Sequence, residues 1–187
     1  MSRPAVPSSS MRMAGRVPPS VPAILSLAIL AGCSGGPEKF APLCPQLKLL
    51  RDTADLTRVR GAGTDVTDLI VNARIDAMPA SCSEGPKGAV KANMKVVMSA
   101  TRGPSATSNK ITLPYLVTVT MGETILEQQY FVASGEFPSN VDRMTVTGDE
   151  IDFLVPATPE KPASAYTIYV SFRLTDAELA YNRAHRK

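Results

Sequence analysis

Residues 111–132 read ITLPYLVTVTMGETILEQQYFV: an alternating run, a tight turn and a second extended run. From Ile111 to Met121 every second side chain is apolar, which is the period of a β-strand that buries one face. A turn centred on Gly122 follows, and the chain returns through residues 124–132. The stretch therefore predicts two neighbouring strands with one face toward a core and the other toward water.

The same two-residue period recurs along the chain, with no long helical pattern between the alternating segments. Further strands are predicted at 69–77, 90–100 and 166–174, in two pieces of 143–155 around the turn at 148–149, and in short pieces at 47–50 and 56–59. About seven to nine such strands predict an all-β fold, an antiparallel, immunoglobulin-like β-sandwich over residues 44–174. A small β-barrel is the alternative, because strand number alone does not separate the two.

The end of the chain, residues 175–187, predicts a short helix and a basic tail. Thr175 and Glu178 have the spacing of a capping box, in which each side chain bonds the other residue's backbone N–H. Asp176 adds negative charge to the first turn, which suits the helix dipole. Leu179 is the expected apolar anchor of this helix on the sandwich.

The first 32 residues differ from the rest in charge and hydropathy. Arg3, Arg12 and Arg16 are their only charged residues, and residues 21–31 are apolar apart from Ser26. This apolar run is shorter than the roughly 20 residues that a membrane-spanning helix needs, and it has the length of the hydrophobic region of a secretory signal. Three methionines are alternative starts of this leader: Met1, Met11 and Met13.

The positive charge of the chain belongs to this leader. The whole chain has 20 Lys and Arg against 17 Asp and Glu, so residues 33–187 are formally neutral without the three arginines. Nucleic-acid binding needs a concentrated basic surface, and the balanced charge argues against a nucleic-acid partner.

The apolar run ends in Leu30-Ala31-Gly32-Cys33, which resembles the lipobox of bacterial lipoproteins. The resemblance implies cleavage between Gly32 and Cys33 and acylation of Cys33. Residues 1–32 are then a lipoprotein signal peptide, and the Gly- and Pro-rich residues 33–43 are a lipidated tether. A plain cleaved signal and a buried turn with an ordinary cysteine are the alternatives.

The resemblance also implies a location and a partner. Ser34 stands where enteric inner-membrane lipoproteins have Asp, which favours the outer membrane, facing the periplasm. The lipid would attach the chain to that membrane, since two or more acyl chains anchor a protein stably. The ending LTDAELAYNRAHRK, residues 174–187, is similar to that of uncharacterised proteobacterial envelope lipoproteins, a group that brings no known activity.

Three cysteines are an odd number for an exported chain. Assigning Cys33 to the lipid leaves Cys44 and Cys82, which are expected to pair in an oxidising compartment. Their bridge would close a loop of about 39 residues, with two unpaired buried thiols as the alternative. The cysteines have neither the spacing of a metal site nor that of a redox motif.

No residue pattern predicts catalysis, a metal or a cofactor. The only histidine, His185, lies in the expected terminal helix, where a charge near the helix end is its simpler interpretation. Asp149, Glu150 and Asp152 in GDEID are explained by a turn and by outward strand positions. The GAGTD motif at 61–65 lacks the GK[ST] of a phosphate loop.

The expected function is therefore that of a non-enzymatic envelope lipoprotein that binds an unidentified envelope protein or maintains envelope structure. Tyr169 and either Tyr130 or Phe131 fall on the outward faces of their strands and could mark a contact surface. Two alternatives stay open: a hydrolase with an unrecognised site, and a carrier or sensor of a small apolar ligand or lipid. In the carrier, adaptable methionine side chains would line a cavity: Met94, Met98 and Met121.

Overall fold

The computed structural model describes residues 43–61 and 65–185. By its internal contacts the chain divides into two units, Met1–Glu38 and Lys39–Lys187, and every described residue belongs to the second. The expected signal peptide, its cleavage site and Cys33 therefore lie outside the described residues, as does all of the expected tether except Leu43.

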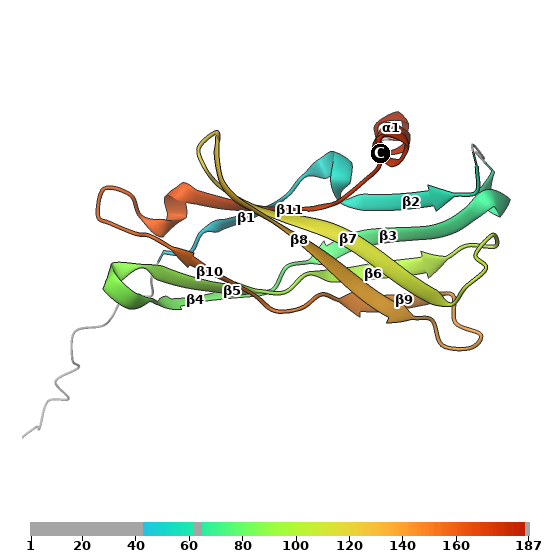
Figure 1. Ribbon diagram of the computed structural model, residues 1–187, viewed down its shortest axis with the longest axis horizontal. Coiled ribbons are helices and arrows are strands. Elements are labelled where there is room, and N and C mark those ends of the chain that lie inside the picture. The colour runs from blue at the N-terminus through green and yellow to red at the C-terminus, as the bar shows by residue number, and fades with distance from the viewer. Residues whose placement is uncertain (1–42, 62–64, 186–187) are drawn as a thin grey trace, which may run out of the picture. The chain divides into compact units, whose positions relative to one another are not determined.

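The described part holds eleven strands, four short 3-10 helices and one α-helix (Figure 1). The strands are β1 (Gln46–Leu49), β2 (Asp55–Val59), β3 (Leu69–Ala77), β4 (Ala80–Glu84), β5 (Val90–Met94), β6 (Val97–Arg102), β7 (Lys110–Met121), β8 (Thr124–Glu136), β9 (Arg143–Thr147), β10 (Ile151–Val155) and β11 (Tyr166–Phe172). The helices are η1 (Arg51–Thr53), η2 (Val66–Asp68), η3 (Pro86–Gly88), η4 (Ala163–Ala165) and α1 (Asp176–Ala184).

The strands form three sheets. The first sheet has the order β1-β11-β7-β8, the second β2-β3-β6-β9 and the third β10-β5-β4. The chain passes directly between the second and third sheets at β3–β4, β5–β6 and β9–β10, so these two sheets lie end to end as one layer. The first sheet faces this layer: β11 lies above the third sheet, and β7 and β8 cross in front of β6 and β9 (Figure 1).

The prediction of an all-β sandwich is confirmed. Each sheet has two open edges, so the described strands do not close into the small barrel that was the alternative. The eleven strands become eight extended passages when each broken strand is counted with its continuation, which agrees with the predicted number. One strand departs from the antiparallel pattern, because β1 pairs with β11 in parallel.

The strand predicted over 90–100 is interrupted at Lys95 and Val96. The Lys95 N–H donates to the carbonyl of Pro79, and the Val96 carbonyl accepts from the N–H of Gly148, at 3.0 and 2.9 Å. Pro79 lies between β3 and β4, and Gly148 lies between β9 and β10, so both hydrogen bonds are made where the neighbouring strands are also interrupted. The apolar alternation continues through the break, and all its members are buried: Val90, Ala92, Met94, Val96, Met98 and Ala100.

The core lies between the two layers and is made by the alternating faces that the sequence predicts. The inward side chains of β7 are buried from Ile111 to Val119, and those of β11 complete the same surface. The largest side chains that are almost fully enclosed are Tyr115, Phe172, Leu56, Ile75, Met94 and Met98. Burial of this apolar surface, at about 25 cal/mol per Å², is the main force that holds the layers together.

Two features of the strands escaped sequence prediction. β4, with the sequence ASCSE, carries no apolar alternation, and it forms because it pairs with β5 over its whole length. β8 extends four residues beyond the predicted end at Val132 because it keeps its pairing with β7 as far as Glu136. The turn between β7 and β8 is the predicted tight turn, in which Gly122 has a positive φ of 59°.

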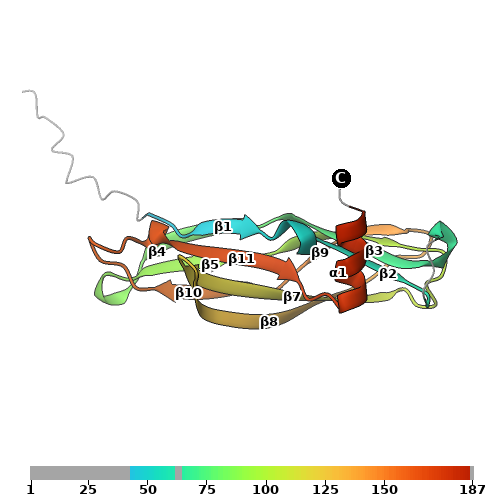
Figure 2. The same ribbon diagram turned by 90° about the horizontal axis from the view of Figure 1, so that it is seen from above.

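α1 begins with the predicted capping box: Thr175 accepts from the N–H of Glu178, and the Glu178 carboxylate accepts from the N–H of Thr175. The helix lies against β2 and η1 (Figure 2). Leu179, the predicted anchor of this helix, is only half-buried, whereas the neighbouring Glu178 side chain is buried. The Asn182 amide also holds the helix by donating to the carbonyls of Asp52 and Asp55.

Candidate interaction surface

The structure pairs Cys44 with Cys82, the two cysteines that the count left for a disulfide. Their Cα atoms are 5.8 Å apart, and the bond joins residues 38 positions apart. Cys44 precedes β1 of the first sheet, and Cys82 lies in β4 of the third sheet. The bridge therefore fastens the point where the chain enters the sandwich to the opposite layer.

Two of the three carboxylates of GDEID, those of Glu150 and Asp152, have structural partners on the outer side of β5 and β10. The Asn93 amide donates to Glu150 at 2.6 Å and to Asp152 at 2.8 Å. Lys95 pairs with Glu150 and Lys91 with Asp152, both at 3.2 Å. The Asn93 hydrogen bond, followed by the lysine, lowers the pKa of each carboxyl group. These groups are therefore ionised partners in a solvated network.

His185 lies at the C-cap of α1. Its ring stacks on Tyr181 with the ring centroids 4.1 Å apart, and its Nδ1 lies 2.8 Å from the carbonyl oxygen of Tyr181. These local contacts agree with the interpretation of His185 as a helix-end residue, and the structure does not bring it together with the GDEID carboxylates, which lie on β10 and the turn before it.

An ion pair between distant parts of the chain had no signal in the sequence. Arg58 on β2 donates to Glu178 on α1 at 2.9 Å, across 120 residues, and also to the carbonyl of Thr112 on β7 at 3.2 Å. The pair borders a hollow of about 500 Å³ between β2 and α1. Because each charge satisfies the other, we assign the pair to helix docking.

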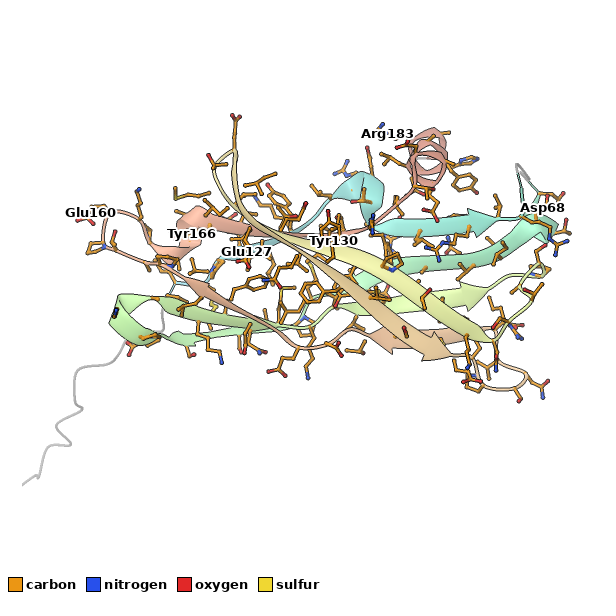
Figure 3. All side chains as sticks on the ribbon, in the orientation of Figure 1. Asp68, Glu127, Tyr130, Glu160, Tyr166 and Arg183 are labelled. Atoms are coloured by element: carbon orange, nitrogen blue, oxygen red, sulfur yellow. A yellow bond between two sulfur atoms is a disulfide. The ribbon has the colours of Figure 1, made fainter. Side chains whose placement is uncertain are left out.

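The most exposed apolar surface of the sandwich is on β8. Of nine large apolar side chains that are exposed in the described part, four belong to this strand: Ile125, Leu126, Tyr130 and Val132. Tyr130 and Val132 expose 63% and 60% of their surface. The prediction that Tyr130 or Phe131 faces outward is resolved in favour of Tyr130, and Figure 3 shows Tyr130 and Glu127 along this strand.

β8 is also an open edge. Among the described strands it pairs with β7 on one side and is the last strand of the first sheet on the other. The inward face at its end packs on the opposite layer, because Ala133 is buried and a Cβ added at Gly135 would come within 3.3 Å of the Val146 side chain on β9. Residues 124–132 therefore form the exposed part of the edge, which we call the open segment of β8.

The aromatic side chains of the open segment are held on opposite faces. Phe131 points inward and stacks on Tyr115, with the ring centroids 5.3 Å apart. Tyr130 points outward, and the Arg173 guanidinium lies 5.3 Å from its ring centroid. A cation–π contact of this kind orients an exposed ring. The Tyr130 ring is therefore held on the outer face of the sheet, while Phe131 joins the segment to the core.

A cavity of about 230 Å³ lies beside the disulfide, between β1, β4, β5 and β11. Its apolar lining includes Leu47, Ala80, Ala92, Met94 and Ile168. Met94 is thus the one member of the predicted methionine set among its lining residues, since Met98 is packed in the core and Met121 is half-buried at the end of β7.

No protein-family model, curated protein or solved structure matches this chain. Within residues 43–61 and 65–185, no helix is long and apolar enough to cross a membrane. In the same ranges, His, Cys, Asp and Glu side chains do not gather in groups of three that could hold a metal ion.

Proposed function

We propose that this chain is a bacterial cell-envelope lipoprotein whose β-sandwich binds another envelope protein through the open segment of β8. The observation that carries the binding role is the coincidence of four exposed apolar side chains with an unpaired strand edge. Natural sheets usually protect such an edge with charges, bulges or a covering element, because it is a template for pairing. This edge has a bulge at Leu126 and one carboxylate, Glu127, but four apolar side chains remain exposed along it, which supports a surface that a partner covers.

The lipid anchor is supported by the sequence. The basic leader, the apolar run and the LAGC box stand in the order that lipoprotein signals require, and Cys33 would carry the lipid. The first strand, β1, begins at Gln46, thirteen residues after Cys33, so the sandwich would be held close to the membrane. We place the protein in the outer membrane, facing the periplasm, on the residue type of Ser34.

Crosslinking in intact cells tests the binding role. A photo-reactive amino acid replaces Tyr130 in one variant and Leu154 in a matched control, because Leu154 is 57% exposed but lies on β10 of another sheet. We expect an adduct with one other envelope protein from position 130 and none above background from position 154. Equal labelling at the two positions, or none at position 130, would contradict the proposal.

A second candidate function, as carrier or sensor of a small apolar ligand, is favoured by the cavity beside the disulfide. Its volume of about 230 Å³ is below the roughly 300–1,000 Å³ of typical ligand sites, so any ligand would be small. Native mass spectrometry of the domain would detect a co-purifying apolar molecule, and Met94→Trp should displace that molecule by filling the cavity. An unliganded mass in both proteins would contradict this candidate.

A further inference from the structure

We propose that the open segment of β8 accepts an extended, basic segment of a different protein near the membrane as an added strand. This inference rests on the proposed function, because it assumes a protein partner and a lipid anchor. It goes further by naming the partner's conformation, its charge and its position.

The conformation follows from the backbone of the edge. Alternate residues of an antiparallel strand direct their N–H and C=O groups away from the paired neighbour, so β8 presents unused hydrogen-bonding groups along its outer side from Glu127 to Val132, after the bulge at Leu126. Added strands satisfy such groups directly and use neighbouring side chains for specificity. The six residues from Glu127 to Val132 span about 20 Å, the length of an ordinary partner strand.

The charge follows from the residues that flank the apolar positions. Between Met121 and Glu136 the chain has three carboxylates, Glu123, Glu127 and Glu136, and neither lysine nor arginine. No ion pair joins Glu123 or Glu127 to any other described residue. Opposite charges on facing strands stabilise pairing, whereas like charges oppose it. Arg173 already lies on the Tyr130 ring at the outer face, whereas Glu127 pairs with Val119 and lies on the other face of the strand. A partner strand with Lys or Arg opposite Glu127 and apolar residues opposite Tyr130 and Val132 is complementary to this edge.

The position follows from the register of the first sheet. Gln46 of β1 lies opposite Thr167, which lies opposite Thr120, which in turn lies opposite Ile125. The open segment therefore begins at the same end of the sheet where the chain enters β1. Ten residues separate Cys33 from Cys44, and a fully extended chain of that length reaches about 35 Å. A partner strand would thus lie within a few tens of ångströms of the anchoring membrane.

A second copy of this chain fits this edge poorly. If two copies paired through β8 around a two-fold axis, their β8 strands would run antiparallel. Within each copy, β1 and β8 run in the same direction, because both run opposite to β7. The starts of the two β1 strands would then lie at opposite ends of the joined sheet. That arrangement places the two anchors far apart, and the charged side chains of the facing edges would be carboxylates only.

The test uses the full lipidated chain in intact cells, with the photo-reactive amino acid at residue 130 and peptide mapping of the adduct. We expect the crosslinked peptide to come from another envelope protein and to contain Lys or Arg close to the crosslinked position. Glu127→Lys should lower the adduct yield about fivefold, the effect expected when an opposite-charge cross-strand pair becomes like-charged. Glu84→Lys, a charge reversal at an exposed site on β4, should leave the yield unchanged.

A photo-reactive group at Tyr169 distinguishes strand addition from docking on the sheet face. Tyr169 lies opposite Thr118, and Thr118 lies opposite Gln128, so residue 169 is two strands away from the edge. An adduct at 169 with none at 130 would overturn the inference. So would an adduct with lipid, an adduct with a second copy, or a yield insensitive to Glu127→Lys. If another protein is crosslinked at residue 130 and Glu127→Lys does not change the yield, the inference alone is overturned. If no protein is crosslinked at residue 130, the proposed function is overturned as well.

Discussion

Glu178 joins three elements through one carboxylate group. It caps α1 through the N–H of Thr175 at 2.7 Å, and it accepts from Arg58 on β2, which also bonds the Thr112 carbonyl on β7. The capping half of this arrangement could be predicted, because Thr175 and Glu178 are three residues apart. The Arg58 half could not, because only the tertiary fold brings together residues 120 positions apart.

Two substitutions separate the roles of Glu178. Glu178→Ala removes the carboxylate half of the capping box and the ion pair and should lower the free energy of unfolding by about 2–3 kcal/mol, less than a fully buried pair because Arg58 is one-third exposed. Glu178→Gln keeps the capping geometry and should cost about 1 kcal/mol. Urea unfolding measures both values, and equal losses for the two variants would contradict the assignment.

Tyr115 makes the free energy of unfolding depend on pH in the alkaline range. Burial raises the pKa of its phenol to about 12, with a smaller contribution from the negative charge of Asp149. The unfolded chain releases this proton near pH 10. The folded state therefore keeps its full stability below about pH 10 and loses a few kcal/mol, about 3 at most, as the pH rises through about 12.

Tyr115→Phe is the matched control for this effect, because it removes the ionisable group and keeps the ring that stacks on Phe131. The difference in unfolding free energy between the native protein and this variant should be constant from pH 7 to pH 9.5 and should change steadily above pH 10. Parallel curves across the whole range would show that Tyr115 does not titrate as its burial requires.

The exposed apolar side chains of the open segment of β8 are not explained by a contribution to the stability of the fold. These side chains contact water, so the double substitution Ile125→Thr and Val132→Thr should change the free energy of unfolding by less than about 0.5 kcal/mol. Val117→Thr, on the buried face of the neighbouring strand, should cost about 1–3 kcal/mol. A large loss in the β8 variant would mean that these side chains serve the fold.

The disulfide holds β1 in place. This strand has only four residues and lies at the other edge of the first sheet, and Cys44 precedes it directly. Replacing both cysteines with serine should lower the free energy of unfolding by about 4 kcal/mol, the entropic effect of opening a loop of this length. Amide hydrogen exchange should speed up most in β1 and β4. If reduced native protein and the variant unfold at different urea concentrations, the bridge is not the source of the loss.

A strand could be predicted from the sequence where it buries one face, and could not be predicted where it does not. The 69–77 alternation coincides with β3, and the turn at Gly148 separates β9 from β10 as predicted. These segments bury one face, so their sequences carry the period of the structure. β4 buries little, so its sequence is free of that constraint, and only its pairing with β5 makes it a strand.

At the scale of the whole molecule, the sequence predicts the class of fold better than its topology. The alternating faces require two packed layers, and the structure has them. The order of strands, the parallel β1–β11 pair and the break at Lys95 depend on contacts between distant residues that no local pattern records. Of the candidate surface, the sequence predicts only that either Tyr130 or Phe131 faces outward, because an unpaired edge is a property of the assembled sheet.

The central claim joins two parts of the chain: a lipid at Cys33 and a partner on β8. Anchoring would raise the effective concentration of a membrane-bound partner around the open segment. The direct test compares the crosslinking yield at residue 130 in the lipidated protein with that in a variant which begins at Ser34 and is exported by a non-lipoprotein signal. We predict the same heteromeric adduct with a yield at least about tenfold lower in the unanchored variant. Equal yields, or no protein adduct in either, would contradict the account.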